Sequence, residues 1–394
     1  MFGMNIIYIS IIVAGVITTA TLISMMPIQH FLVLDNFHVV KIQKLVDDET
    51  IWKSIHPKNN EKEEYVVTEG MDWSDDGKLV AFGVNAGAPV SYLWTMNATG
   101  EDMEPANIPI EFNSVSYVHI SKDDNSVFFV GQYNSKNETY QDIFKYDIKN
   151  KTYLFITRDS HVESVGYMPD GKIIYVQGHS NATRLEKDTP VFLIKHYDVL
   201  WLASHDGQKI RPLYNSTQLF AGMAASPDGD RVAFVSHEDP LHPSSNGTDI
   251  VNFASLGPPN ANYYSYLAVF DINTKKFTVV DKADNEEFAD LKWLSDDLIL
   301  YETMTHHCVQ DRVPGSQSCP AGLLDLMTVS SHKSQVVYGS QAEPYTPPLA
   351  GAAISPDGRS LVFGINYDYS NGIIDGKGIY RIDFDKPLWQ GLGG

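Results

Sequence analysis

Histidine side chains with the chemistry to bind a metal gather in two long polar segments of the sequence. His237 and His242 lie in one segment, and His306 and His307 lie in the other. Imidazoles brought to one face can hold a transition metal, whereas single histidines in loops are usually solvated. Adjacent residues such as His306 and His307 cannot easily bind one ion, so we expect no metal and no other cofactor.

Two aromatic residues extend this set. Tyr263 and Tyr264 follow the sequence Pro-Pro-Asn, which is typical of a loop. Tyrosines on an exposed loop can anchor a protein or glycan partner, whereas Tyr266 begins a predicted strand and is expected to pack in the core. The candidate residues of a binding face are therefore His237, His242, Tyr263, Tyr264, His306 and His307.

The two cysteines of the chain, Cys308 and Cys319, lie in one loop. A disulfide between them would close a short loop and contribute on the order of 3 kcal/mol. Two free thiols or half of a metal site are the alternatives. We expect the disulfide, which implies an oxidising compartment.

Other reactive groups have plainer interpretations. Paired aspartates at Asp75-Asp76, Asp123-Asp124 and Asp296-Asp297 suggest Ca²⁺, but they occupy a repeated turn in which Asp bonds its own backbone, and EF-hand spacing is absent. The sequence also contains no Gly-x-Ser-x-Gly nucleophile motif. We therefore assign no catalytic residue.

A repeated turn and strand must position the candidate residues. In the clearest copy, Pro227 presets φ, Asp228 bonds the local backbone and Gly229 supplies a positive φ, and the apolar run Val232–Val235 follows. Five further copies begin at Trp73, Ile120, Met168, Leu294 and Ile354.

Each copy continues with a strand that ends near Asp, as in Asp142–Asp147 and Gly378–Asp383, and then with a further short strand. Four short strands per unit are typical of a propeller blade. The Ser-Pro-Asp-Gly turn with this continuation resembles the TolB-like, or WD40-like, repeat found in TolB and in the propellers of the tricorn and prolyl-oligopeptidase families. The resemblance covers residues 69–385 and implies an all-β, six-bladed TolB-like β-propeller. Some propellers of this class resemble oligogalacturonate lyase, whose Mn²⁺ site depends on a His-x-His pair that this chain lacks.

The last repeat has three predicted strands and then the chain nearly ends. A strand from the N-terminal region is expected to complete it, because closure removes an exposed edge. Of the segments His38–Leu45 and Tyr65–Thr68, the second is the better candidate because it directly precedes blade one. The expected domains are a membrane anchor or signal segment (1–30), a linker with the ring-closing strand (31–68), the propeller (69–385) and a tail (386–394).

The long insertions share one position in their repeats. They lie between the second and third strands of their blades, so alternating strand direction brings them to one face, which is the expected binding face. These insertions are Gln177–His196, Ser236–Ser265, Thr303–Leu323 and Asn366–Lys377.

The N-terminal segment Asn5–Met26 contains no charged residue, and a helix of this length crosses roughly 30 Å of hydrocarbon. No basic residue precedes it, so an uncleaved transmembrane anchor is favoured over a signal peptide. Lys41 and Lys44 alone would keep the propeller cytoplasmic. Two other features indicate an extracytoplasmic propeller, namely the predicted disulfide and six glycosylation sequons, at Asn97, Asn137, Asn150, Asn181, Asn215 and Asn246.

The net charge of −20 and the lack of a basic stripe argue against a nucleic-acid partner. We therefore expect a membrane-tethered, extracytoplasmic propeller that acts as a non-catalytic protein- or glycan-binding scaffold or accessory subunit. The first alternative is a polysaccharide lyase or a hydrolase with its site at the mouth of the propeller channel. The second is a ligand-binding sensor in which a small acidic channel excludes anions and captures a cation.

Overall fold

The computed structural model describes most of the chain from residue 39 onward. The described ranges are 39–55, 66–85, 91–135, 138–158, 160–184, 191–216, 220–236, 239–242, 248–252, 264–284, 286–305, 309–310, 317–318, 322–338, 349–365 and 377–390. The predicted anchor, Asn5–Met26, lies outside them. Within these ranges, no helix has the length and apolar character needed to span a bilayer.

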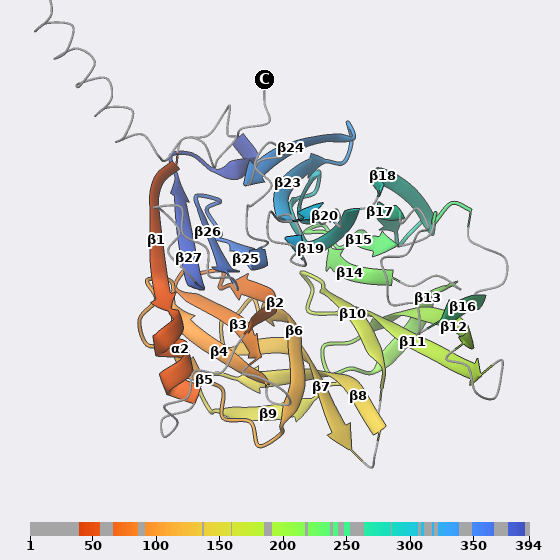
Figure 1. Cartoon of the computed structure of the whole chain (residues 1–394), viewed down its shortest axis with the longest axis horizontal. Coiled ribbons are helices and arrows are strands. Elements are labelled where there is room, and N and C mark those ends of the chain that lie inside the picture. The colour runs from red at the N-terminus through yellow and green to blue at the C-terminus, as the bar shows by residue number, and fades with distance from the viewer. Residues whose placement is uncertain are drawn as a thin grey trace, which may run out of the picture.

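The described strands form six antiparallel blades of four strands each, arranged in chain order (Figure 1). The strands of blades one and two are joined in one eight-stranded sheet, and β16 adds a fifth strand to the sheet of blade three. The first three blades are β2 (Val66–Trp73), β3 (Leu79–Asn85), β4 (Ser91–Asn97) and β5 (Glu104–Pro105); β6 (Phe112–Ile120), β7 (Ser126–Ser135), β8 (Glu138–Asp147) and β9 (Thr152–Phe155); and β10 (Val162–Tyr167), β11 (Ile173–Arg184), β12 (Val191–Ala203) and β13 (Lys209–Ser216). One residue pairing, Ser91 with Phe112, joins the sheets of blades one and two.

The last three blades repeat the pattern. They are β14 (Phe220–Ala225), β15 (Arg231–Ser236), β17 (Tyr264–Asp271) and β18 (Lys276–Asp284); β19 (Glu286–Ser295), β20 (Leu298–Thr305), β23 (Gly322–Thr328) and β24 (Lys333–Tyr338); and β25 (Leu349–Ile354), β26 (Ser360–Ile365), β27 (Gly378–Phe384) and β1 (Val39–Asp47). Outside the blades lie β16 (Thr248–Asn252), β21 (Val309–Gln310), β22 (Gln317–Ser318), the helix α2 (Asp48–Ile55) and the 3₁₀ turn η1 (Leu388–Gln390).

The repeated turn is fixed by its buried serine. In blade four, the Gly229 N–H donates to the Ser226 carbonyl at 2.9 Å, and Gly229 has a φ of +75°. The Ser226 hydroxyl donates to Asp228 and accepts the Arg231 N–H at 2.9 Å. Each of these bonds recurs around Ser355 in blade six, so the turn delivers the chain directly into the next strand.

The apolar strands are buried on both faces. Val232 and Phe234 pack in the cluster between blades three and four, whereas Ala233 and Val235 pack in the cluster between blades four and five. Six such clusters occupy the six boundaries between consecutive blades, including the boundary of blade six with blade one. The continuous apolar runs of the repeats therefore build a closed ring.

An N-terminal strand completes blade six, as predicted, but the preferred segment was wrong. Strand β1 pairs antiparallel with β27, from Val39 opposite Phe384 to Asp47 opposite Gly378. The segment Tyr65–Thr68 falls largely in β2, the innermost strand of blade one, where Val66 pairs with Asn85. Blade one needs these residues for its own sheet, so the earlier strand is the one left to cover the edge.

Ile51 and Val40 test whether this N-terminal segment is part of the ring. Ile51 of α2 is fully buried between blades six and one, whereas Val40 of β1 is 67% exposed. Ile51→Ala should lower the free energy of unfolding by about 2–5 kcal/mol, because it leaves a cavity in a packed core. Val40→Ala should stay within about 0.5 kcal/mol of the wild type. Urea unfolding followed by tryptophan fluorescence measures both, and a wild-type midpoint for Ile51→Ala would contradict this packing.

Candidate functional site

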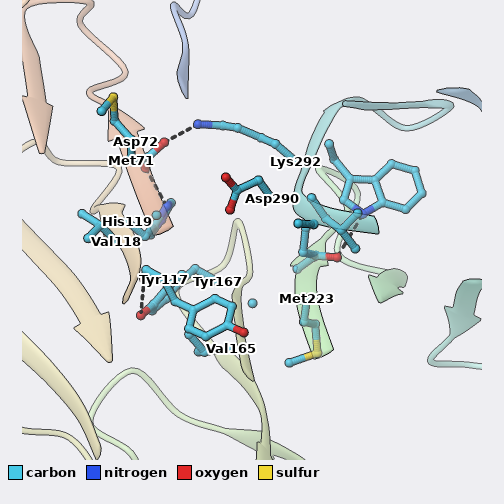
Figure 2. Close-up of a pocket in the computed structure, with 18 of the residues that line it drawn as sticks. Met71, Asp72, Tyr117, Val118, His119, Val165, Tyr167, Met223, Asp290 and Lys292 are labelled. Atoms are coloured by element: carbon cyan, nitrogen blue, oxygen red, sulfur yellow. Dashed lines mark hydrogen bonds and ion pairs between the residues drawn. The ribbon is translucent and has the colours of Figure 1, made fainter. Parts of the chain in front are cut away.

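The innermost strands of the blades enclose a cavity of about 290 Å³ on the propeller axis (Figure 2). Residues of β2, β6, β10, β14, β19 and β25 line it. The cavity thus draws on every blade of the ring. It is therefore the first candidate for a functional site.

Three of the blades place an ionisable side chain at the same position of the innermost strand. The residue pairings align Asp72, His119 and Lys292 of blades one, two and five, which lie opposite Ala81, Phe128 and Leu300. Blades three, four and six carry small residues at this position, namely Gly166, Ala224 and Ala353. Gly166 and Ala224 also line the cavity, where their small size leaves space for the charged side chains.

Asp72 connects the three charged blades. Its carboxylate pairs with the Lys292 ammonium from across the cavity, and it accepts bonds from His119 Nδ1 and the Ile120 N–H, each at 2.9 Å. Burial raises the pKa of Asp72, but the charges and hydrogen bonds of Lys292 and His119 outweigh burial and hold that pKa well below its ordinary value. Asp72 is therefore an anion at neutral pH.

The imidazole of His119 lies between Asp72 and an aromatic wall. Its ring stacks on the Tyr167 ring, with centroids 4.5 Å apart and planes 10° apart. The Tyr167 hydroxyl reaches the Tyr117 carbonyl at 3.4 Å. Burial, with a smaller contribution from the Asp72 charge, raises the pKa of Tyr167 well above its ordinary value, so this phenol stays protonated.

A second repeated feature lies two residues before the charged position. In five blades the ladder of the innermost strand is irregular there, and the residue at this point has a positive φ. Glycine occupies this position in blades one, four and six, as Gly70, Gly222 and Gly351, but blades two and five have Tyr117 (φ 51°) and Asp290 (φ 48°). A side chain in this conformation costs about 1–2 kcal/mol relative to glycine, so Tyr117 and Asp290 are strained positions at the cavity.

The site has the parts of an acid–base centre. Asp72 orients His119 through Nδ1, and no described residue bonds the second ring nitrogen, Nε2. In such a dyad the carboxylate fixes the tautomer, and Nε2 is the nitrogen that can accept or donate a proton. Among the described residues, no group of three His, Cys, Asp or Glu side chains is arranged to hold a metal ion.

Most of the binding-face candidates are not placed by the structure. His237, Tyr263, His306 and His307, the pair Cys308 and Cys319, and the sequons Asn137 and Asn246 lie outside the described residues. His242 is exposed and pairs with Asp239 at 3.1 Å, and it is not among the residues that line the cavity. The remaining candidate of the binding face, Tyr264, begins β17. Of the predicted glycosylation sites, Asn181 lies in β11, and Asn97 ends β4 and bonds Asp102. Asn150 and Asn215 are exposed.

Sequence analysis missed the residues of the cavity because it searched the loops. The signal was present in the repeats. Aligned on their turns, the copies place Asp72 and His119 two residues before Ser74 and Ser121. In blade five the turn is one residue shorter, so the equivalent Lys292 is found only from the pairing of Trp293 with Ile299.

The fold and the site define a six-bladed β-propeller with a lined axial cavity. The sequence matches no protein-family model and no curated protein. The solved structures to which the chain is similar include oligogalacturonate lyase from Vibrio parahaemolyticus, at 12% identity and a TM-score of 0.45, with 88% of this chain and 97% of that chain covered.

Two further structures show the range of the similarity. TolB from Acinetobacter baumannii is 16% identical with a TM-score of 0.40, over 73% of this chain and 58% of that chain. A puromycin-hydrolyzing peptidase from Mycobacterium tuberculosis is 12% identical with a TM-score of 0.45, over 76% of this chain and 43% of that chain. TolB and oligogalacturonate lyase are TolB-like propellers, in agreement with the resemblance stated above. At these identities and scores, the similarity transfers no activity, substrate or partner to this chain.

Asp72→Asn tests the central ion pair. The substitution leaves the Lys292 charge without its partner, which costs ~3–5 kcal/mol for buried pairs; we expect the lower end because Lys292 is partly exposed. Because the pKa of Asp72 is lower in the folded state, its charge stabilises the fold at any pH above its ordinary pKa of 3.8. This stabilisation is lost as the pH falls from 3.8 through the pKa of the folded state. The difference in unfolding free energy between wild type and variant should therefore be full at pH 7 and shrink below about pH 4.

The matched control for Asp72→Asn is Glu104→Gln. This substitution removes the exposed ion pair with Lys151, in which the charged atoms are 2.8 Å apart, and should change stability little. Urea titrations between pH 3 and pH 7 measure all three proteins. A pH-independent difference for Asp72→Asn would contradict the assigned charge of Asp72.

Proposed function

We propose that this protein is a non-catalytic binding scaffold that recognises a glycan or a protein through the propeller face that carries the long insertions. The observation that carries the proposal is a groove of about 530 Å³ on blade two. Its lining joins the connection that precedes β6 to the end of β7, and the β7–β8 connection emerges at that same end.

The groove combines aromatic surface with carboxamides. Tyr153 and Phe155 of β9 are half-buried, with ring centroids 6.3 Å apart. Tyr133 is buried beneath them, and its hydroxyl donates to Asp142 at 2.8 Å, which fixes the ring. Flat aromatic surface with nearby polar groups suits the apolar face and the hydroxyls of a sugar ring.

The polar wall of the groove is a pair of asparagines. The side chains of Asn113 and Asn134 bond each other, with nitrogen–oxygen distances of 3.3 and 3.4 Å, and Thr139 donates to Asn134 at 3.0 Å. Each carboxamide has two N–H donors and two acceptor lone pairs, so this pair retains bonding capacity toward a ligand. The mutual bonds hold both side chains in place before a ligand arrives.

Blades three and four extend the same face. Strands β11 and β12 continue as a long hairpin, and β16, from the insertion of blade four, pairs with β12 from Val191 opposite Asn252 to Lys195 opposite Thr248 (Figure 1). The insertion of one blade is thus built onto its neighbour. Such a joined surface supports recognition of a large partner more than turnover of a small substrate.

The proposed location is extracytoplasmic, with the propeller tethered to a membrane by residues 5–26. The uncharged N-terminal segment, the sequons and the disulfide expected between Cys308 and Cys319 support this location. Among the described sequons, Asn150 and Asn215 are exposed, as glycosylation requires.

Tyr153→Ala tests the groove, with Leu154→Ala as its control. Tyr153 lines the groove, whereas its neighbour Leu154 is 57% exposed and, on a strand, points to the other side. On an array of glycans, Tyr153→Ala should reduce wild-type binding at least tenfold, because it removes the stacking surface, and Leu154→Ala should bind as the wild type does. Equal binding by both variants would refute the groove as the recognition site.

A second candidate function rests on the dyad of Asp72 and His119. With Lys292 close by, it provides a base and a cation, the groups needed to remove a proton beside a carboxylate in a polysaccharide lyase, or to activate water in a hydrolase. In this case the wild type should cleave an acidic polysaccharide, and His119→Gln should lower the rate by about 10²–10⁴. Product release from a panel of polyuronates measures it, and an inactive wild type removes this candidate.

A further inference from the structure

The groove on blade two has one charged residue among the described residues that line it, and that residue is Glu111. Glu111 is exposed and directly precedes β6. In the part of the chain that the structure describes, no residue forms a hydrogen bond or an ion pair with its carboxylate. The negative charge of Glu111 is therefore available to a ligand, and electrostatic complementarity favours a ligand that carries a positive charge.

The described neighbours on the adjoining strands leave this charge in place. Glu138 adds a second exposed carboxylate, because it pairs across the β7–β8 hairpin with Ser135, which lines the groove. Lys145 pairs with Leu154, and both side chains lie on the side of the sheet away from Tyr153 and the groove. Neither Glu138 nor Lys145 therefore neutralises Glu111.

Arg158 shows that the aromatic surface beside the groove attracts a cation. Its exposed guanidinium lies over the Phe155 ring, 4.8 Å from the ring centre, although Arg158 is not among the lining residues. The face of an aromatic ring is electrically negative and attracts positive charge. The Phe155 and Tyr153 rings both line the groove with Glu111, so an ammonium group bound there would meet aromatic surface as well as a carboxylate.

We propose that this groove recognises a glycan whose sugar rings carry free amino groups, with Glu111 as the counter-ion of a protonated amine. The inference rests on the glycan-binding function proposed above and names the class of sugar. The Tyr153 and Phe155 rings pack against the apolar face of the sugar, and the pair of Asn113 and Asn134 bonds its hydroxyls. An acetylated amine carries no charge and loses the attraction, whereas a uronate is repelled by Glu111.

Calorimetric titration of the full chain tests the proposal with three oligosaccharides of equal length, built from glucosamine, N-acetylglucosamine and galacturonate. The buffer is mildly acidic, so that the glucosamine amines are protonated. The glucosamine oligomer should bind at least tenfold more tightly than the N-acetylglucosamine oligomer, and the galacturonate oligomer should show no binding that Tyr153→Ala abolishes. Equal binding of the first two oligomers, or galacturonate binding that Tyr153→Ala abolishes, would overturn the proposal.

Two substitutions that remove opposite charges give the sign of the interaction. Glu111→Gln should weaken binding of the glucosamine oligomer about three- to fivefold, the effect of one exposed ion pair, and leave binding of the N-acetylglucosamine oligomer unchanged. Arg158→Gln should leave binding of the glucosamine oligomer unchanged or strengthen it, because the guanidinium competes for the same ring surface. The reverse pair of results is expected for an anionic ligand and would contradict the proposal.

Glu101→Gln is the control for attraction to the protein as a whole, whose net charge is −20. Glu101 is an exposed carboxylate between β4 and β5 and does not line the groove. Its substitution removes the same charge as Glu111→Gln and should leave binding of the glucosamine oligomer at the wild-type value. An equal loss of binding in the two variants would show attraction to the whole surface, and the proposal would be wrong.

Failure of this inference and failure of the scaffold function give different results. If the N-acetylglucosamine oligomer or another uncharged glycan binds best, and Tyr153→Ala abolishes that binding, the groove remains a glycan site and only the specificity for amines is wrong. If the chain binds none of the three oligomers, the specificity for amines is also wrong. The proposed glycan recognition fails only if the wider array of glycans shows no binding either.

Discussion

Burial of every blade on both faces is the constraint on which this structure depends. A sheet with one apolar face can end a fold, but Val232 to Val235 alternate between two different inter-blade cores, so each blade needs a neighbour on either side. The requirement is met only by a ring. It also explains why β1 is taken from the far end of the sequence: β27 would otherwise present an open edge in blade six. Arg381 reinforces that boundary by donating to the Ala98 carbonyl at 3.0 Å and stacking over Trp73.

The close approach of the innermost strands limits which residues can surround the axis. The innermost strands approach so closely that a Cβ atom on Gly70 would lie 2.6 Å from the Tyr117 nitrogen, and one on Gly351 would lie 3.3 Å from the Gly70 nitrogen. Space for a side chain is therefore absent at Gly70, where blades one and two meet, and tight at Gly351, where blade six meets blade one. In blade five, Asp290 and Lys292 occupy the two positions at which most other blades have glycine or another small residue.

The turn signature predicted the six-bladed ring because it is local: the serine, aspartate and glycine of one turn bond one another, and they need no distant partner. The closing strand was assigned to the wrong segment because period-two alternation does not identify the partner of a strand. Val39–Asp47 and Val66–Trp73 read alike, and only the demand of blade one for its innermost strand separates them. The axial site was missed for a related reason. Its residues come from different blades, so Asp72 and Lys292, which are far apart in sequence, meet only when the ring closes.

The residues that form the ring are separate from the residues that determine the chemistry of the axial cavity, so one scaffold can carry different chemistries. The turn and the two-faced strands fix the ring, and a single position on each innermost strand then decides what the axis contains. Asp72, His119 and Lys292 replace small residues at that position without altering the pairing of their strands with Ala81, Phe128 and Leu300. Their charges are tolerated because Asp72 is satisfied by three partners from two other blades. The ion pair of Asp72 and Lys292 therefore forms because the ring closes, and it also stabilises the closed ring. The residues at the axis can vary while the cores between the blades stay unchanged.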